Sequence, residues 1–197
     1  MKTGPRHKCG VHNLDILLES SFSGARRNTL DIYKKVMKYW GAEKCLMLRH
    51  FIASIAYRAT KAMKNAPDTY PNLYIGKGVR TPIRILHHIT GVLTYAHSFF
   101  EHYDTTYSDI KSWNEEVDEF YNILSKLDKS LKEDIPSKVT KEQLLQGPLS
   151  DSMAHVGQLL MLRRMADSPV PSENFIFADI RKGEVGPDQP DPVAPDE

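Results

Sequence analysis

The chain has few cysteines, no long apolar run and no excess of charge of either sign. Its two cysteines, Cys9 and Cys45, form neither a metal-binding spacing nor a disulfide framework, which is typical of a reduced intracellular protein. No stretch of about 18 uncharged apolar residues occurs, and the start of the chain has no apolar segment of signal-peptide length. We therefore expect a soluble, cytoplasmic protein with no membrane contact.

Basic and acidic residues nearly balance, at 26 against 25, so the net charge is only +1. This balance argues against a general binder of nucleic acid or of acidic membranes. The glycine patterns of dinucleotide-binding and phosphate-binding loops are missing, and no catalytic triad or cysteine nucleophile stands out. With 197 residues, the chain suits one domain that buries roughly two-thirds to three-quarters of its unfolded surface.

Strand signals are scarce, and apolar residues recur instead at the three-to-four spacing of helices. This periodicity predicts a first helix over 26–40 and four longer helices over 43–65, 82–102, 108–131 and 148–166. Thr81-Pro82 supports the second of the long helices, because Thr caps a helix and Pro suits its first position. The expected fold is an all-α, antiparallel four-helix bundle with an extra N-terminal helical arm.

The same pattern predicts three segments along the chain. Residues 1–41 form the N-terminal arm, residues 42–181 the bundle, and residues 182–197 a tail rich in proline and acid. The tail holds four prolines and five acidic residues, a composition typical of disorder. The alternative is a segment pinned against the body of the protein or against a neighbouring molecule.

The fragment Asp151-Ser-Met-Ala-His155-Val-Gly-Gln158 carries the strongest chemical signal. A carboxylate and an imidazole four residues apart lie on one face of a helix and can be offered to a single cation. Gly157 stands in the middle of this helix, where glycine costs roughly 1 kcal/mol relative to alanine. We expect the close approach of a neighbouring helix to compensate for that cost.

A third candidate ligand lies in the twin histidine His87-His88 of another helix, 63 residues before Asp151. The two rings point about 100° apart, so only one of them faces a given site. We prefer His88, because it shares a face with an apolar stripe that we expect to point inward, formed by Val92, Tyr95 and Phe99. Two helices of a bundle could then assemble two histidines and one carboxylate around an open metal position.

Two fragments, Arg80-Thr-Pro-Ile-Arg-Ile-Leu-His-His88-Ile and Asp151-Ser-Met-Ala-His155-Val-Gly-Gln-Leu159, resemble the DinB/YfiT-like superfamily of small bacterial four-helix-bundle proteins. A weaker match lies in residues 168–180, and the similarity in pattern covers roughly residues 43–180. In that family, one histidine of the second bundle helix and two histidines of the last bind a divalent metal, often zinc or nickel. The resemblance places the ligands at His88, His155 and Asp151, of which Asp151 departs from the usual histidine.

The departure at Asp151 changes the metal preference that the resemblance implies. Two histidines and one carboxylate are a known ligand set for iron(II), zinc or manganese. The carboxylate lowers the net charge of the site and makes the set of ligand atoms chemically harder, which disfavours nickel and copper. We expect a divalent metal among zinc, iron, manganese and nickel, with Gln158 orienting a ligand or a substrate one turn away.

The resemblance also implies a function, because characterised members include transferases of low-molecular-weight thiols and thiol-dependent isomerases. We expect a metal-dependent enzyme that acts on a small molecule, with thiol S-transfer favoured over hydrolysis. A metal with an open position lowers the pKa of a bound thiol, or activates water. The alternative is a non-catalytic binding or interaction module with a degenerate site, in which Asp151 only caps the last helix.

Assembly is a further expectation, since members of this family are often homodimers. This chain has an apolar cluster before the predicted helices, formed by Leu14, Ile16, Leu17, Leu18 and Phe22. Exposed clusters of this kind commonly mark contacts. We expect a homodimer, with residues 11–22 buried either between subunits or over one end of the bundle.

Overall fold

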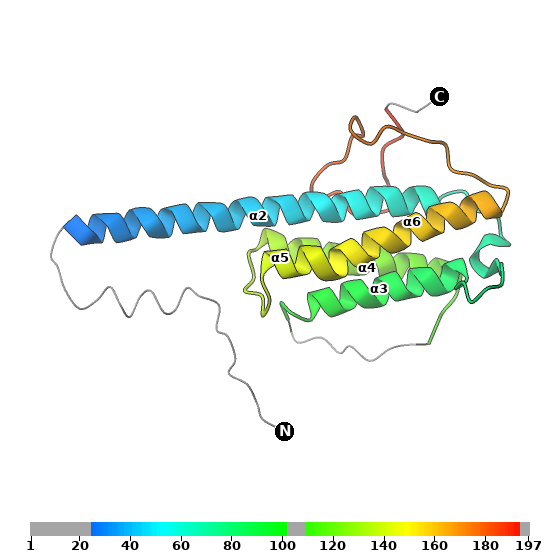
Figure 1. Ribbon diagram of the computed structural model, residues 1–197, viewed down its shortest axis with the longest axis horizontal. Coiled ribbons are helices and arrows are strands. Elements are labelled where there is room, and N and C mark those ends of the chain that lie inside the picture. Colours follow the sequence, from blue (N-terminus) through cyan, green and yellow to red (C-terminus); the bar gives the residue numbers. More distant parts are fainter. Residues whose placement is uncertain (1–24, 102–108, 194–197) are drawn as a thin grey trace, which may run out of the picture. The chain divides into compact units, whose positions relative to one another are not determined.

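A computed structural model describes residues 25–101 and 109–193 of the chain (Figure 1). No β-strand occurs among these residues, and the predicted all-α class is confirmed. The helices are α2 (Ala25–Met63), α3 (Pro82–His97), α4 (Trp113–Lys132), α5 (Lys141–Leu144) and α6 (Ser150–Met165). A short 3-10 turn (Tyr70–Asn72) precedes α3, and one π-helical turn (Leu145–Leu149) joins α5 to α6. Within the described ranges, every helix is too short or too polar to cross a membrane.

α2 is one continuous helix where the sequence predicted two, over 26–40 and 43–65. Gly41 does not end it, since glycine inside a helix costs only about 1 kcal/mol and no proline or capping turn follows. The chain divides into two compact units, residues 1–41 and 42–197, so the boundary falls inside α2. In the first unit, the side chains of residues 31–40 are all exposed.

The start of α4 differs from the prediction. The helix begins at Trp113, whereas the expected start, Ser108, lies outside the described residues. Ser112 caps it reciprocally: its Oγ accepts from the Glu115 backbone N–H at 3.4 Å, and the Glu115 carboxylate accepts from the Ser112 N–H at 3.0 Å. This capping box is written in the sequence as Ser-x-x-Glu, and our prediction missed it.

The helical path is interrupted before α6. Thr140 and Gln143 form a capping box at the start of α5. Gly147 then leaves the helical conformation, with φ −94° and ψ −106°, and Pro148 follows it inside the π-helical turn. The chain thus changes direction immediately before the helix that carries Asp151.

The core of the second unit lies among the C-terminal part of α2 and helices α3, α4 and α6, which run side by side in Figure 1. α3 packs against both α4 and α6. Each helix contributes side chains that are 3 % exposed or less, among them Ile52, Ile55 and Tyr57 of α2, Leu86 and Ile89 of α3, Phe120 and Leu124 of α4, and Val156 and Leu159 of α6. The α3–α6 contact is the one that positions the candidate site.

Two arginines tie these helices together through polar contacts. Arg49 of α2 donates from Nε and Nη2 to the carboxylate of Asp128 on α4, at 2.8 and 2.9 Å. Arg163 of α6 is buried and donates to the carbonyl oxygens of Ala62 and Lys64 at the end of α2, at 3.1 and 3.0 Å. Arg163 thereby satisfies carbonyl groups that the end of a helix leaves without partners.

The segment after α6 is anchored to α2. Glu173 is buried, and its carboxylate accepts from the Tyr57 hydroxyl at 2.8 Å and lies 2.5 Å from Lys61 Nζ. Further along, Val185 is 5 % exposed and belongs to the core. The part of the expected tail that the structure describes, up to residue 193, therefore includes a side chain packed against the body.

Candidate metal centre

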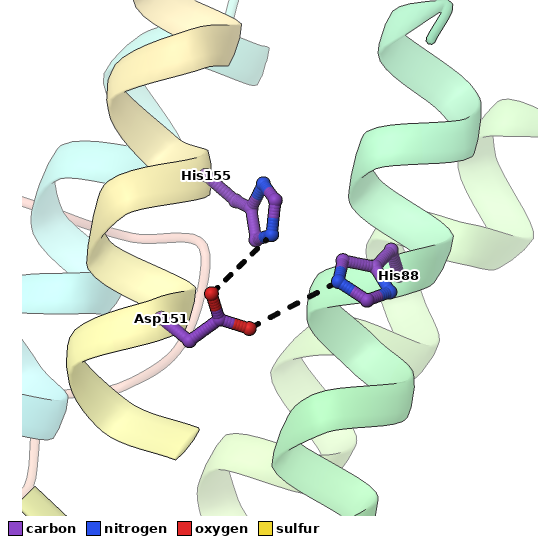
Figure 2. A group of neighbouring side chains, drawn as sticks. All are labelled: His88, Asp151 and His155. Carbon is purple, nitrogen blue, oxygen red and sulfur yellow. Dashed lines mark ion pairs between the residues drawn. The ribbon is translucent and has the colours of Figure 1, made fainter. Parts of the chain in front are cut away.

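His88, Asp151 and His155 come together between α3 and α6 (Figure 2). One potential ligand atom from each residue lies within 4.8 Å of the other two. Nε2 of His155 is 3.6 Å from Asp151 Oδ1, and Nε2 of His88 is 3.9 Å from Asp151 Oδ2. The imidazole rings are nearly perpendicular, at 87°, with centroids 4.6 Å apart. The structure thus brings together the three residues that the sequence singled out.

The start of α6 positions two of the three side chains. The Ser150 hydroxyl donates to the Leu145 carbonyl at 2.6 Å, and the Ser152 hydroxyl donates to the Pro148 carbonyl at 2.8 Å. These bonds satisfy carbonyl groups around the π-helical turn, where the regular helical ladder is broken. They hold the backbone at the start of α6, and Asp151 belongs to its first turn.

His87 fixes the orientation of α3 from the other side. It is buried, and its Nδ1 lies 3.0 and 3.1 Å from the two carboxylate oxygens of Glu116 on α4. Glu116 also accepts from the Lys111 backbone N–H at 2.8 Å. Since adjacent helical residues point about 100° apart, the α4-facing His87 leaves His88 directed toward α6.

The apolar stripe by which we preferred His88 faces the core only in part. Tyr95 is 55 % exposed, whereas Phe99 is half-buried and packs against the core. Ile85 and Ile89 form the buried face of α3, and His88 lies at the edge of that face, with 28 % of its side chain exposed. The choice of residue agrees with the geometry, but the reason given for it holds only in part.

The expectation for Gly157 was also wrong. Gly157 is exposed, and no other atom lies within 4 Å of the position that a Cβ would occupy. Close approach of a neighbouring helix therefore does not explain this glycine, and nothing in the structure does.

The environment of His88 favours its neutral form. Burial is the main cause that lowers the pKa of His88. Electrostatic interaction with His155 and the positive charge of Arg80 lower it further, while Asp151 acts in the opposite direction. A histidine ligates a metal through its neutral ring, so a lowered pKa reduces competition from protons at neutral pH.

Gln158 determines which nitrogen of His155 faces the centre. Its Oε1 lies 2.9 Å from His155 Nδ1, and an amide oxygen can only accept a hydrogen bond. Nδ1 therefore carries the proton, and the lone pair of Nε2 faces Asp151 and His88 (Figure 2). Metal-binding histidines are commonly oriented by such a partner on the other ring nitrogen.

The separations fit a small divalent ion. Ligand atoms that each lie about 2.1 Å from one ion are at most about 4.2 Å apart. The distances of 3.6 and 3.9 Å to the Asp151 carboxylate meet this limit, and all three ligand atoms lie within 4.8 Å of one another. Two nitrogens and one carboxylate oxygen suit zinc, iron(II) or manganese. The Asp151 side chain is 51 % exposed, so one side of the group is open to solvent.

A cavity of about 580 Å³ adjoins the candidate centre at His155. His155 and Gln158 belong to its lining, together with residues of the loop before α3 and of the last turns of α6. This volume is typical of small-molecule sites. Sequence reasoning did not find the cavity, because the loop and α6 are far apart along the chain.

No family model, no curated protein and no solved structure matches this chain. The resemblance to the DinB/YfiT-like superfamily therefore rests on the two helix fragments and stays a prediction.

Proposed function

We propose that the chain is a divalent-metal-dependent enzyme that acts on a small molecule, and that its helices form the antiparallel four-helix bundle of the DinB/YfiT-like type. The observation that carries the proposal is the convergence of His88, Asp151 and His155 from two helices at ligand spacing. The contact of α3 with both α4 and α6 supports the bundle.

Thiol S-transfer is our preferred reaction, ahead of hydrolysis. A divalent ion with an open coordination position lowers the pKa of a thiol or of water. Three protein ligands leave such a position, and the exposure of Asp151 gives access to it. The order of preference follows the resemblance, since both reactions need the same three ligands.

Bound metal is the first test of the proposal. Full-length protein purified without a histidine tag is analysed by elemental mass spectrometry, beside His155→Ala. His50→Ala is the matched control, because His50 is an exposed histidine of α2 outside the group. We expect about one ion per chain in the wild type and in the control, and little in His155→Ala. Equal, negligible metal in all three proteins would remove the basis of the proposal.

A second candidate belongs to another class: a non-catalytic binding or interaction module with a degenerate site. The observation in its favour is the position of Asp151 in the first turn of α6, where a carboxylate is favourable without any metal. In this case Asp151→Asn leaves the metal content unchanged and shifts the melting temperature only slightly. A large loss of metal in Asp151→Asn excludes the degenerate-site view.

A further inference from the structure

The cavity beside the candidate metal centre, here called the flanking cavity, lies between the loop before α3 and helix α6. Its volume of about 580 Å³ leaves room for a small organic molecule. His155 and Gln158 belong to its lining, but most of the lining residues lie outside the candidate centre. The binding preference of the flanking cavity is therefore decided mainly by residues that take no part in the centre.

The two walls of the flanking cavity are held in place. Tyr70, in the 3-10 turn before the loop, is buried, and its hydroxyl donates to the Leu159 carbonyl of α6 at 2.8 Å. Within the loop, Gly76 and Gly78 have φ values of +76° and +73°, and the Val79 backbone N–H donates to the Gly76 carbonyl at 3.1 Å. Glycine adopts this left-handed conformation at little cost. The loop wall thus has a defined backbone, and the cavity is formed without a ligand.

The charge of the flanking cavity is of one sign. Its permanently charged lining residues are Lys77 and Arg80, and no acidic residue belongs to the lining. Among the described residues, no carboxylate lies within ion-pair distance of either cation, whereas Arg49 and Lys61 each have such a partner. Two cations without a carboxylate partner favour an anion that comes from outside the chain.

The rest of the lining is largely apolar. Val79, Met161 and Met165 are 39 %, 56 % and 46 % exposed, and Ile75 and Leu162 also belong to the lining. Exposed apolar side chains that gather around one cavity commonly mark a ligand site. Methionine side chains are flexible and adapt to irregular ligands. The flanking cavity therefore suits a molecule with a short carbon chain as well as an anionic group.

Another cavity of similar volume, about 570 Å³, differs in charge. It lies at α2, α4 and the C-terminal segment, and its lining combines the cations Lys64 and Arg181 with the acids Glu184 and Asp188. Arg181 also forms an ion pair with Asp179. Balanced charges give no preference for an anion there.

We infer that the flanking cavity binds small aliphatic anions, that is, molecules with one carboxylate or phosphate group on a short carbon chain. Arg80 and Lys77 bind the anionic group, to which a guanidinium can donate two parallel hydrogen bonds. Met161 and Met165 contact the carbon chain. The inference does not rest on the proposed function, because both cations belong to the chain itself and no metal is needed.

Four six-carbon compounds test the inference: hexanoate, hexyl phosphate, hexanol and hexylamine. They are titrated into full-length protein whose methionine methyl groups carry carbon-13, and the NMR shifts give the dissociation constants. We expect at least one of the two anions to bind roughly five- to tenfold more tightly than hexanol, and hexylamine to bind most weakly. The tighter anion shows which anionic group the cavity prefers. Higher salt concentration reduces the difference, since both cations are exposed.

The same titrations locate the ligand. We expect the methyl signals of Met161 and Met165 to shift, and the signal of Met47, an exposed methionine of α2 outside the flanking cavity, to stay in place. Butyrate should bind up to about tenfold more weakly than hexanoate, because it buries two methylene groups fewer.

The double variant Arg80→Gln/Lys77→Gln removes the two cations. We expect it to bind hexanoate, hexyl phosphate and hexanol equally, with hexanol affinity and metal content unchanged. Lys129→Gln/Lys132→Gln is the matched control, because it removes two exposed cations of α4 that lie outside the flanking cavity. We expect this control to keep the preference for anions.

The outcomes separate the inference from the proposed function. If neither anion binds more tightly than hexanol, the inference is overturned. A preference for anions that survives in Arg80→Gln/Lys77→Gln also overturns it, since the anion is then held elsewhere, for example by a metal at the centre. Shifts at Met47 without shifts at Met161 and Met165 overturn it as well. Protein that carries no metal and still prefers the anions upholds the inference and overturns the proposed function alone.

Discussion

The hydrogen bond between His155 Nδ1 and Gln158 Oε1 is only 2.9 Å long, and the candidate centre depends on it. It places the proton of His155 on the nitrogen that faces away from Asp151 and His88. Without this partner the ring can adopt the other tautomer or rotate, and each alternative removes a lone pair from the centre.

We predict that Gln158→Leu weakens zinc binding by about 10- to 100-fold, because the acceptor for Nδ1 is lost. Gln158→Glu is the matched variant, since a carboxylate oxygen also accepts from Nδ1, and we expect it to retain most of the affinity. The measurement is competition with a zinc chelator of known affinity. Equal affinities in the wild type and Gln158→Leu would show that Gln158 does not orient the ligand.

A second prediction concerns His97 of α3, which is 3 % exposed and has its Nε2 3.3 Å from the Ser130 hydroxyl oxygen. Burial is the main cause that lowers the pKa of His97 below its ordinary value of 6.5, with a contribution from Lys126. As the pH falls, His97 of the unfolded chain therefore takes up a proton at a higher pH than His97 of the folded protein does. The contribution of neutral His97 to the free energy of unfolding is fully present above about pH 6.5, the value for the unfolded chain. This contribution is lost as the pH falls toward the pKa of His97 in the folded state.

His97→Gln removes this titration and keeps a hydrogen-bonding group for Ser130. We expect the free energy of unfolding, measured in urea between about pH 7.5 and 5.5, to fall less steeply in the variant than in the wild type. The pKa of His88 is also lowered, but His88 is present in both proteins and its effect cancels. Parallel curves would contradict the role assigned to His97.

The residues of the candidate centre could be predicted in part from the sequence. The spacing of Asp151 and His155 is a local signal, because four residues of helix bring two side chains to one face. The role of Glu116 could not be predicted, since it faces His87 only after α3 and α4 have packed. The sequence identified Arg80 only as the first residue of the fragment that contains His88. Its position in the lining of the cavity depends on the path of the loop before α3.

At the scale of secondary structure, the sequence predicted where helices occur more accurately than it predicted the residues at which they begin and end. The apolar period identified every long helix, but α3 ends at His97 rather than near His102 and α4 begins at Trp113. Capping interactions decide such ends, and the sequence offers several candidate caps. The continuity of α2 through Gly41 was missed because one glycine lowers helix stability without ending the helix.

The C-terminal segment provides a prediction at this scale, at Gly183. Its φ is +93°, and a Cβ there would lie 3.1 Å from Nη2 of Arg49, which is paired with Asp128. We predict that Gly183→Ala lowers the free energy of unfolding by about 1–2 kcal/mol, since the backbone conformation is costly for any residue with a Cβ.

Gly186→Ala is the matched control. Gly186 has no φ in the left-handed region and no atom within 4 Å of its would-be Cβ. We expect its effect on unfolding to be small, and thermal unfolding of the two variants beside the wild type measures the difference. Equal stabilities of Gly183→Ala and Gly186→Ala would show that the backbone conformation of Gly183 does not make a Cβ costly at this position.

At the scale of the whole molecule, exposed apolar side chains indicate where two copies of the chain could associate. The first part of α2 exposes large apolar side chains, each between 45 % and 65 % exposed, namely Ile32, Tyr33, Val36, Met37, Tyr39 and Trp40. The apolar cluster within residues 11–22 lies outside the described residues, so its expected burial stays a prediction. Apolar surface of this kind commonly marks a contact between proteins.

We predict a homodimer that depends on the N-terminal region. Sedimentation of the full-length protein should give the mass of a dimer, and a chain that lacks residues 1–24 should give the mass of a monomer. The double variant Val36→Glu/Trp40→Glu tests the exposed part of α2 separately, because buried unpaired carboxylates oppose association. A dimer that survives the truncation and dissociates in the double variant places the contact on α2. A monomeric full-length protein contradicts the prediction.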